Sequence, residues 1–290
     1  MTSDDGCCPS RTLTASLVRG ALTSPFKRAG RSGATLTADR LTAGNVRITP
    51  GALASYSRIC GFRESGPLPL TYPHVLGFPL AMRLMTGHRF PLPVVGLVHT
   101  WIEITRHRAS PATDLLELTV YADGLTPHRR GTEVTMVTEA RSHDELVWES
   151  RSGYLSRHPT TTAAAPAAVG AAPAAELPAV AEWRLRGDLG RRYGAASGDR
   201  NPIHLYPLTA RLFGFPRAIA HGMWTVARCL AEADDPGRIR AVRADFKAPV
   251  LLPATVTYAA DGSGSAFQLR SGSRIHLTGS TTRDGGGPDS

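Results

Sequence analysis

Cysteine is scarce in this sequence. The four cysteines, Cys7, Cys8, Cys60 and Cys229, form neither a Cys-x-x-Cys pair nor a spacing that binds zinc, and the histidines and acidic residues show no zinc spacing either. A Gly-x-Ser-x-Gly turn, which presents the nucleophile in many serine hydrolases, is also missing. These absences argue against a disulfide framework, a metal site and that class of hydrolase.

Long apolar runs are missing as well. No run approaches the roughly 20 residues that a membrane-spanning helix needs. The polar start of the chain, Met1–Arg11, holds no apolar segment of the kind found in secretory signals. Hydrophobic residues nevertheless make up 42% of the chain, which is enough for a substantial core. We therefore expect a reduced, soluble, cytoplasmic protein without a membrane span.

Lysine is almost absent, since Lys27 and Lys247 are the only two, and arginine supplies the rest of the positive charge. The net charge is +9, from 33 basic and 24 acidic residues. No dense basic run and no nucleic-acid-binding motif accompanies this charge, so we predict no nucleic-acid partner. An anionic molecule that bears phosphate fits the charge, although an ordinary arginine-rich surface explains most of the excess.

Composition divides the 290-residue chain into two folded halves. We place them at residues 36–157 and 182–280. Residues 158–181 between them are rich in threonine, alanine and proline and almost without charge, which predicts a flexible linker. We expect residues 1–35 to be partly disordered and the tail over residues 281–290 to be disordered.

Each half reads as a helix followed by antiparallel strands, which is an α+β layout. In the first half, apolar spacing predicts a helix over Val75–Met85, with Pro79 in its first turn, where a missing N–H costs least. Alternating or apolar segments over residues 94–154 predict strands. In the second half, we predict helices over Leu185–Ala196 and Ala218–Ala233, followed by four short strands.

The stretch over residues 193–210 organises the rest of the chain. Turn-forming residues after Ser197 predict that the incoming helix ends there, and Pro202 stiffens the bend that follows. Asp199 and His204 then lie on an ordered loop, where a carboxylate and an imidazole can hold one water molecule between them. The plainer alternative is an aspartate that caps a helix and a histidine on the surface.

This stretch resembles the signature of the MaoC-like dehydratases, the family of the (R)-specific enoyl-CoA hydratases. The matching residues are Tyr193, Ser197, Gly198, Asp199, Asn201, Pro202, Ile203, His204 and Ala210. Ala196 is a mild departure, because the family more often has a branched aliphatic residue or glycine there. The resemblance implies a hotdog fold, in which an antiparallel sheet wraps around a central helix.

The two halves repeat each other in sequence. The segment Val75–Met85 parallels Ile219–Leu230, and the strands that follow, Val98–Glu103 and Val242–Lys247, also correspond. The first half has no counterpart of the loop with the aspartate and the histidine. The resemblance, which covers roughly residues 40–280, therefore implies a double hotdog with one active-site loop. The first half would fill the place of the second subunit of the homodimeric hydratases.

The resemblance implies the roles of five residues in the hydration of a trans-2-enoyl thioester. Asp199 and His204 would grip one water molecule and act as general base and general acid, with the division between them left open. Asn201 would hold the loop or orient the histidine, with a plain turn residue before proline as the alternative, and Ser197 would support the loop. Gly222 would offer its main-chain N–H to the thioester oxyanion at a helix N-terminus. No cofactor is implied, because the chemistry is addition of water.

Four further residues are weaker candidates for substrate binding. His221 precedes the oxyanion glycine and is otherwise a packing histidine. Arg243 and Lys247 lie near the end of a predicted strand and are candidate phosphate partners, although isolated basic residues are usually solvated. Phe78, with Leu76, Leu80 and Met82, would wall an acyl tunnel, and the alternative for all four is ordinary core.

The predicted function is thus an enoyl thioester hydratase that acts equally as a 3-hydroxyacyl thioester dehydratase, a hydro-lyase of fatty-acid metabolism. Its substrate would be carried by coenzyme A or by acyl carrier protein. Two other classes stay open: a non-catalytic acyl-binding subunit and a hotdog thioesterase. Acyl chain length, physiological direction and oligomeric state, including a homodimer of double hotdogs, are also left open.

Overall fold

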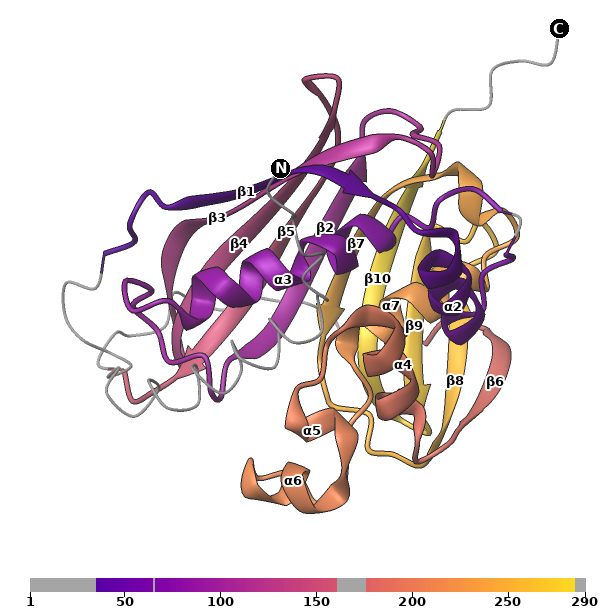
Figure 1. Ribbon diagram of the computed structural model, residues 1–290. Coiled ribbons are helices and arrows are strands. Elements are labelled where there is room, and N and C mark those ends of the chain that lie inside the picture. The colour runs from indigo at the N-terminus through magenta and orange to yellow at the C-terminus, as the bar shows by residue number, and fades with distance from the viewer. Residues whose placement is uncertain (1–34, 65, 161–175, 285–290) are drawn as a thin grey trace, which may run out of the picture.

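The computed structural model describes residues 35–64, 66–160 and 176–284, and its ten strands form one sheet (Figure 1). The strand order is β1-β3-β4-β5-β2-β7-β10-β9-β8-β6, and every neighbouring pair is antiparallel. The predicted α+β class is confirmed. Most of the segments expected to be disordered, residues 1–35 and 281–290, lies outside the described residues, as does most of the expected linker. Residues 281–283 of the expected disordered tail instead belong to the last strand, β10.

The bounds of the elements are as follows. The strands are β1 (Arg40–Arg47), β2 (Val98–Arg106), β3 (Leu115–His128), β4 (Gly131–Ser142), β5 (Glu145–Arg157), β6 (Ala179–Leu185), β7 (Ile239–Phe246), β8 (Ala254–Ala260), β9 (Ala266–Ser271) and β10 (Arg274–Arg283). The helices are α2 (Pro50–Cys60), α3 (Tyr72–Thr86), α4 (Leu189–Ser197), α5 (Pro202–Leu205), α6 (Pro207–Leu212), α7 (Gly222–Ala231) and the 3₁₀ turn η2 (Pro236–Arg238).

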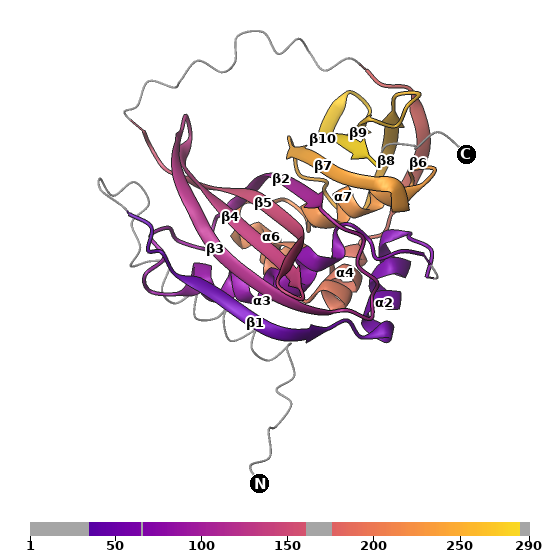
Figure 2. The same ribbon diagram turned by 90° about the horizontal axis from the view of Figure 1, so that it is seen from above.

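The sheet consists of two halves that meet at one strand pair. Strands β1 to β5 lie with α3, and strands β6 to β10 lie with α7 (Figure 2). Strand β2 pairs with β7, so that Glu103 faces Arg243 and Ile104 faces Val242 across the junction. This pairing places the end of β7 and the tip of α7 beside the first half. The start of α7 therefore lies next to residues that come from more than 100 positions earlier.

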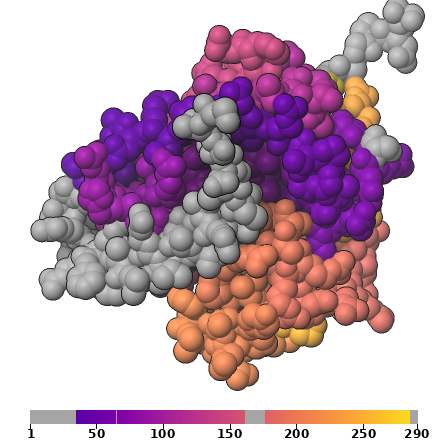
Figure 3. All heavy atoms as spheres, in the orientation of Figure 1, coloured from indigo at the N-terminus to yellow at the C-terminus, as the bar shows by residue number. Residues whose placement is uncertain are grey.

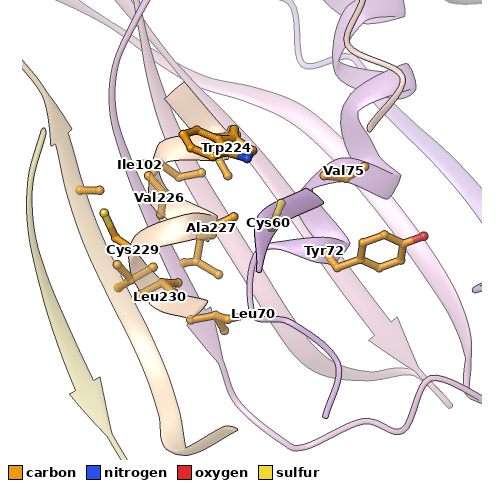
Figure 4. Close-up of a cluster of buried hydrophobic side chains, with 14 of the residues drawn as sticks. Cys60, Leu70, Tyr72, Val75, Ile102, Trp224, Val226, Ala227, Cys229 and Leu230 are labelled. Atoms are coloured by element: carbon orange, nitrogen blue, oxygen red, sulfur yellow. The ribbon is translucent and has the colours of Figure 1, made fainter. Parts of the chain in front are cut away.

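The main core fills the space between the helices and the sheet. Ile102 and Ile104 are almost fully buried, whereas Glu103 between them is only partly buried, because side chains on a strand alternate between faces. Helix α7 packs on this face through Trp224, Val226, Ala227, Cys229 and Leu230 (Figure 4). The Trp224 indole N–H also donates to the Ile59 carbonyl at 2.9 Å, which ties α7 to α2 of the other half.

Helix α3 begins earlier than the sequence predicted. It starts at Tyr72, with Pro73 in the first turn, so Pro79 lies inside the helix and its expected place in the first turn was wrong. The physical reason is that Pro73 already occupies the position where a missing N–H costs little. The predicted helix therefore begins about one turn later than the observed one.

None of the described helices is long and apolar enough to cross a membrane.

The second half begins with a strand rather than a helix. In β6, Trp183 and Leu185 are buried, and the residues on either side of Trp183 are exposed, which is the alternation of an edge strand packed on one face. Strand β6 starts at Ala179, inside the range assigned to the linker, and pairs with β8. The predicted helix over Leu185–Ala196 is shorter in the structure, because α4 begins at Leu189.

Candidate active site

The loop after α4 is held by hydrogen bonds of its own side chains. Helix α4 ends at Ser197, and Gly198 follows in the left-handed conformation with φ of 78°. The Ser197 hydroxyl donates to the Tyr193 carbonyl at 2.9 Å and accepts the Asp199 N–H at 3.2 Å. The Asp199 Oδ1 atom accepts the Asn201 N–H at 3.1 Å, which leaves Oδ2 for another partner. Ser197 thus supports the loop, as the sequence suggested.

Asn201 holds the start of α5. Its side-chain oxygen accepts the Ile203 N–H at 3.4 Å, a helix cap of the usual kind. Two glycines of α4 allow the helix to lie directly against the loop. A Cβ at Gly190 would lie 1.9 Å from the His204 carbonyl oxygen, and one at Gly194 would lie 2.7 Å from the Asp199 carbonyl oxygen. Sequence reasoning missed both positions, although glycine inside a helix pattern was a usable signal.

The tautomer of His204 follows from one hydrogen bond. Its Nδ1 atom lies 2.8 Å from the Ile219 carbonyl, which only accepts, so Nδ1 carries the hydrogen. In the neutral ring, Nε2 then keeps a lone pair and acts as an acceptor. Burial lowers the pKa of His204, and the charge of Asp199 partly opposes this. His204 is therefore a neutral imidazole at pH 7, with a basic nitrogen free of the backbone.

Asp199 and His204 lie together, as the sequence predicted. Their ligand-type atoms and those of His221 all lie within 4.8 Å of one another. Burial raises the pKa of Asp199, while His204 and the N–H of Asn201 lower it in part. The Asp199 side chain keeps 24% of its surface accessible, so the carboxylate can still be reached from outside.

His221 supports this pair from behind. Its ring is stacked on that of His204, with centroids 3.7 Å apart and planes at 25°. Its Nε2–H donates to the Asp199 carbonyl at 3.0 Å and lies 3.8 Å from Asp199 Oδ2. Burial, and then the neighbouring His204, lower its pKa well below the usual range. His221 is thus a buried neutral ring that holds both Asp199 and His204 in place.

Gly222 is the first residue of α7, directly after His221. The N–H groups of the first turn of a helix have no carbonyl partner within the helix, so they are available to an anion. A Cβ at Gly222 would lie 2.9 Å from the edge of the Phe246 ring. The absence of a side chain therefore lets the Phe246 ring lie against the start of α7, next to His221.

The first half contributes rings next to Gly222. His99 lies between Phe246, with ring centroids 4.7 Å apart, and Tyr154, with centroids 4.5 Å apart. Burial, and secondarily the charge of Asp199, raise the pKa of Tyr154, which places this ring within electrostatic reach of the loop. His99 Nε2 is buried and has no hydrogen-bond partner in the part of the chain that the structure describes. Sequence reasoning missed His99 and Tyr154.

Comparison with known proteins identifies the family. The family model described as "MaoC like domain" matches residues 168–277. The 3-hydroxyacyl-thioester dehydratase X of Mycobacterium tuberculosis is 40% identical over 228 residues, which span 77% of this chain and 81% of that protein. The chain belongs to the MaoC-like dehydratase family. The resemblance inferred from residues 193–210 is confirmed.

Solved structures agree with this MaoC-like assignment. The crystal structure of HtdX from Mycobacterium tuberculosis superposes with a TM-score of 0.72 at 36% identity, covering 84% of this chain and 100% of that chain. Another Mycobacterium tuberculosis protein, described as a double hotdog fold, has a TM-score of 0.51 at 15% identity, covering 84% of this chain and 94% of that chain. The predicted double hotdog fold of this MaoC-like protein is therefore confirmed.

Two weaker candidates for substrate binding, Arg243 and Lys247, lie apart from the loop of this MaoC-like protein. Arg243 is ion-paired with Glu103 at 2.6 Å and with Asp245 at 3.2 Å, and its guanidinium lies over the Trp101 ring. Lys247 is exposed just after β7. Successive strand residues point to opposite faces, so the Arg243 side chain lies on the face of β7 away from Phe246. Arg243 is therefore already neutralised and does not reach the site.

Phe78 lies in a second apolar cluster under α3. The cluster contains Ala81, Met82, Met85, Phe90, Leu92, Val120, Val134 and Met136, with Phe78 and Tyr154 partly buried against it. Phe78 thus packs against the same cluster as Tyr154, whose ring is stacked on His99. This position is consistent with a wall for an acyl chain, and its role stays a prediction.

The same three site residues are also a candidate metal-ligand set in the described ranges. Two hydrogen bonds leave Nε2 of His204 and Nδ1 of His221 as the acceptor nitrogens. Because these rings are stacked 3.7 Å apart with planes at 25°, the two lone pairs lie in separate, nearly parallel planes. A tetrahedral metal site needs ligand lone pairs that converge on one point. The arrangement therefore suits a water molecule and proton transfer better than a metal ion.

Proposed function

We propose that this protein is a dehydratase and hydratase of acyl thioesters. It interconverts (3R)-3-hydroxyacyl and trans-2-enoyl thioesters carried by coenzyme A or acyl carrier protein. The observation that carries the proposal is the meeting of Asp199 and neutral His204 with His221, the residue directly before Gly222 at the start of α7. The name of the relative from Mycobacterium tuberculosis supports the same reaction.

In this proposal each group has its own part in the reaction. In hydration, the water oxygen bonds to C3, one water hydrogen leaves it, and a proton joins C2, so the elements of water are added across the double bond. Asp199 Oδ2 and His204 Nε2 are both acceptors, and together they bind the two hydrogens of one water molecule. The pair removes a proton from this water and returns one to C2. Dehydration follows the same steps in reverse.

Gly222 acts on the thioester rather than on the water. Negative charge grows on the thioester oxygen as water adds to C3, and a fixed N–H donor stabilises it. The N-terminal amide of α7 is held in place by the helix and therefore needs no reorganisation during the reaction. The Phe246 ring against Gly222 and His99 beyond it keep this side of the site apolar and aromatic.

The first test is hydration of crotonyl-CoA and longer enoyl-CoA substrates, followed by loss of enoyl absorbance. We expect activity in the wild type and a fall of roughly 10²–10⁴-fold in kcat for Asp199→Asn, because a general acid–base group contributes about that much. Asp188→Asn is the matched control, since Asp188 belongs to α4's start and pairs with Arg186. A wild type inactive at every chain length, or an Asp199→Asn variant of unchanged rate, contradicts the proposal.

The same reactions separate the other functions. Release of free thiol from acyl-CoA identifies a thioesterase, and acyl-CoA binding without turnover identifies a non-catalytic subunit. Chiral analysis of the product tests the (3R) configuration. We retain the cytoplasmic location as part of the proposal, because Cys60 and Cys229 are free and buried. The homodimer stays a prediction, which light scattering tests.

A further inference from the structure

Large apolar side chains are exposed together around α6. In the described ranges, seven large hydrophobic residues are exposed, and the set is Val95, Leu115, Val180, Tyr206, Leu208, Leu212 and Phe213. Four of these seven fall within residues 206–213. Leu208 and Leu212 are 72% and 79% exposed, which is extreme for leucine. Clustered exposed apolar side chains usually mark an interaction site, whereas single ones do not.

This apolar cluster belongs to the same loop as the catalytic histidine. Helix α6 lies directly after α5, and the Thr209 hydroxyl donates to the Pro202 carbonyl at 2.6 Å, which fixes one helix on the other. The Arg191 guanidinium donates to the Leu205 carbonyl at 3.1 Å and so ties this segment to α4. The two helices project from the body of the molecule (Figure 1), and the same segment forms the orange bulge at the bottom of Figure 3. The cluster is thus held rigidly beside the site.

The segment that carries the cluster is rich in arginine. Between residues 189 and 221 the only acidic residue is Asp199, which belongs to the site. The same span holds five exposed arginines: Arg191, Arg192, Arg200, Arg211 and Arg217. None of the five forms an ion pair with a carboxylate in the described ranges, where Arg58, Arg106, Arg151 and Arg228 do. Uncompensated charges of one sign attract an oppositely charged partner over about 8 Å at physiological salt.

We propose that the α5–α6 surface docks an acidic acyl carrier protein that delivers the thioester on its flexible arm. The proposal rests on the proposed function and names the carrier. An apolar centre with an arginine rim matches the anatomy of a protein–protein interface, and acidic side chains of the partner would pair with the arginines. The phosphates of coenzyme A alone would use the arginines but would leave Leu208 and Leu212 uncovered. Docking here places the arm of the partner next to His204.

The experiment compares two carriers of one acyl chain. We would measure kcat/KM for the same enoyl group on acyl carrier protein and on coenzyme A, with wild type, Leu208→Ser and Arg211→Glu. The surface variants should lose roughly tenfold or more with the carrier protein, as interface hot spots do, and stay within about twofold with coenzyme A. Raising salt should weaken the wild type on the carrier protein more than it weakens Arg211→Glu.

The chain offers a matched control on its far edge. Arg47 and Leu115 are exposed and lie opposite each other on β1 and β3. Arg47→Glu and Leu115→Ser make the same chemical changes away from α6 and should leave both substrates unaffected. Coenzyme A activity and thermal unfolding show whether each variant is folded. If Leu208→Ser destabilises the segment, Arg211→Glu still tests the surface, because it changes a charge and not an apolar side chain.

Four results would overturn the docking surface. These are unchanged carrier-protein kinetics in both surface variants, an equal loss on the two carriers, an equal loss in the far-edge controls, and binding to anionic lipid vesicles that the variants lose while carrier-protein kinetics stay the same. Each of these leaves coenzyme A hydration by the wild type intact. A wild type inactive with both carriers would instead contradict the proposed function itself.

Discussion

The rings of His204 and His221 are stacked face to face, with centroids 3.7 Å apart. Two imidazolium ions at this distance would repel each other strongly, and both rings are also buried. Each ring therefore stays neutral at pH 7, with its tautomer fixed by a backbone carbonyl, Ile219 for one ring and Asp199 for the other. His204 therefore keeps an unprotonated, basic Nε2 atom at pH 7.

We expect the acidic limb of the kcat/KM profile to lie below pH 6.5, the ordinary value for imidazole. Burial lowers the pKa of His204, so protonation that abolishes its acceptor nitrogen occurs only at more acidic pH. In Asp199→Asn, the opposing charge is lost and the pKa of His204 should fall further. Histidine titration by NMR checks this, with Asp188→Asn as control. A His204 that titrates at or above 6.5 would contradict the account.

Gly222→Ala should abolish most activity. Its Cβ would lie 2.9 Å from the Phe246 ring, so the ring or the tip of α7 must shift, and the oxyanion amide shifts with it. We expect a loss of roughly 10²-fold or more, as for removal of one oxyanion donor. Adding Phe246→Ala removes the clash and should restore part of kcat in the double variant. No recovery would show that the glycine is needed for another reason.

Gly190→Ala should displace the catalytic loop. Its Cβ would meet the His204 carbonyl oxygen at 1.9 Å, which backbone atoms cannot tolerate. Gly51 is the second residue of α2 as Gly190 is of α4, and a Cβ there would meet nothing within 4 Å. Gly51→Ala should therefore stabilise the protein by up to about 1 kcal/mol. Thermal unfolding and crotonyl-CoA hydration compare the two variants, and equal behaviour would contradict the close approach.

Acid should destabilise the fold through His74. Burial lowers the pKa of His74 to about 4 from 6.5. Between these values the unfolded chain binds a proton that the folded protein does not, so the free energy of unfolding falls as pH falls through this window. The contribution reaches about 3 kcal/mol at 1.36 kcal/mol per pKa unit. His74→Asn should flatten the fall in chemical denaturation between pH 6.5 and 4, whereas exposed His88→Asn should not.

Removal of metal ions should not change the rate. The stacked rings hold their lone pairs in separate, nearly parallel planes, so the three candidate ligands do not converge on a tetrahedral site. We expect protein dialysed against EDTA to hydrate crotonyl-CoA at the rate of untreated protein. A loss of activity that zinc or another divalent ion restores would contradict this interpretation and would assign Asp199, His204 and His221 to a metal.

The sequence predicted the loop because its chemistry is local. Ser197, Asp199 and Asn201 make their defining contacts within a few positions, and Pro202 restricts the backbone before His204. The fold class was likewise predictable, because the two halves repeat one pattern. These features depend on short-range geometry and on periodicity, which one sequence displays.

Other features depend on contacts that one sequence does not display. His99 and Tyr154 come to the site through the pairing of β2 with β5 and β7, and nothing in their own segments indicates that neighbour. Arg243 was misleading for the same reason, since its partner Glu103 lies on the other half. The early start of α3 was missed because Pro73 and Pro79 each fit the first turn of a helix. The edge strand β6 was missed because its short alternation overlaps the residues assigned to the linker and to the next helix.

The junction of β2 and β7 has a consequence for how the protein varies. Separate subunits of a dimer can exchange with other copies. Here one peptide chain joins a first half without the aspartate–histidine loop to a second half that carries it, so the two are always present in equal number. The first half therefore does not need an active-site loop of its own. A substitution at His99 or Tyr154 accordingly affects the site of the same molecule, because that half cannot be exchanged for an unaltered copy.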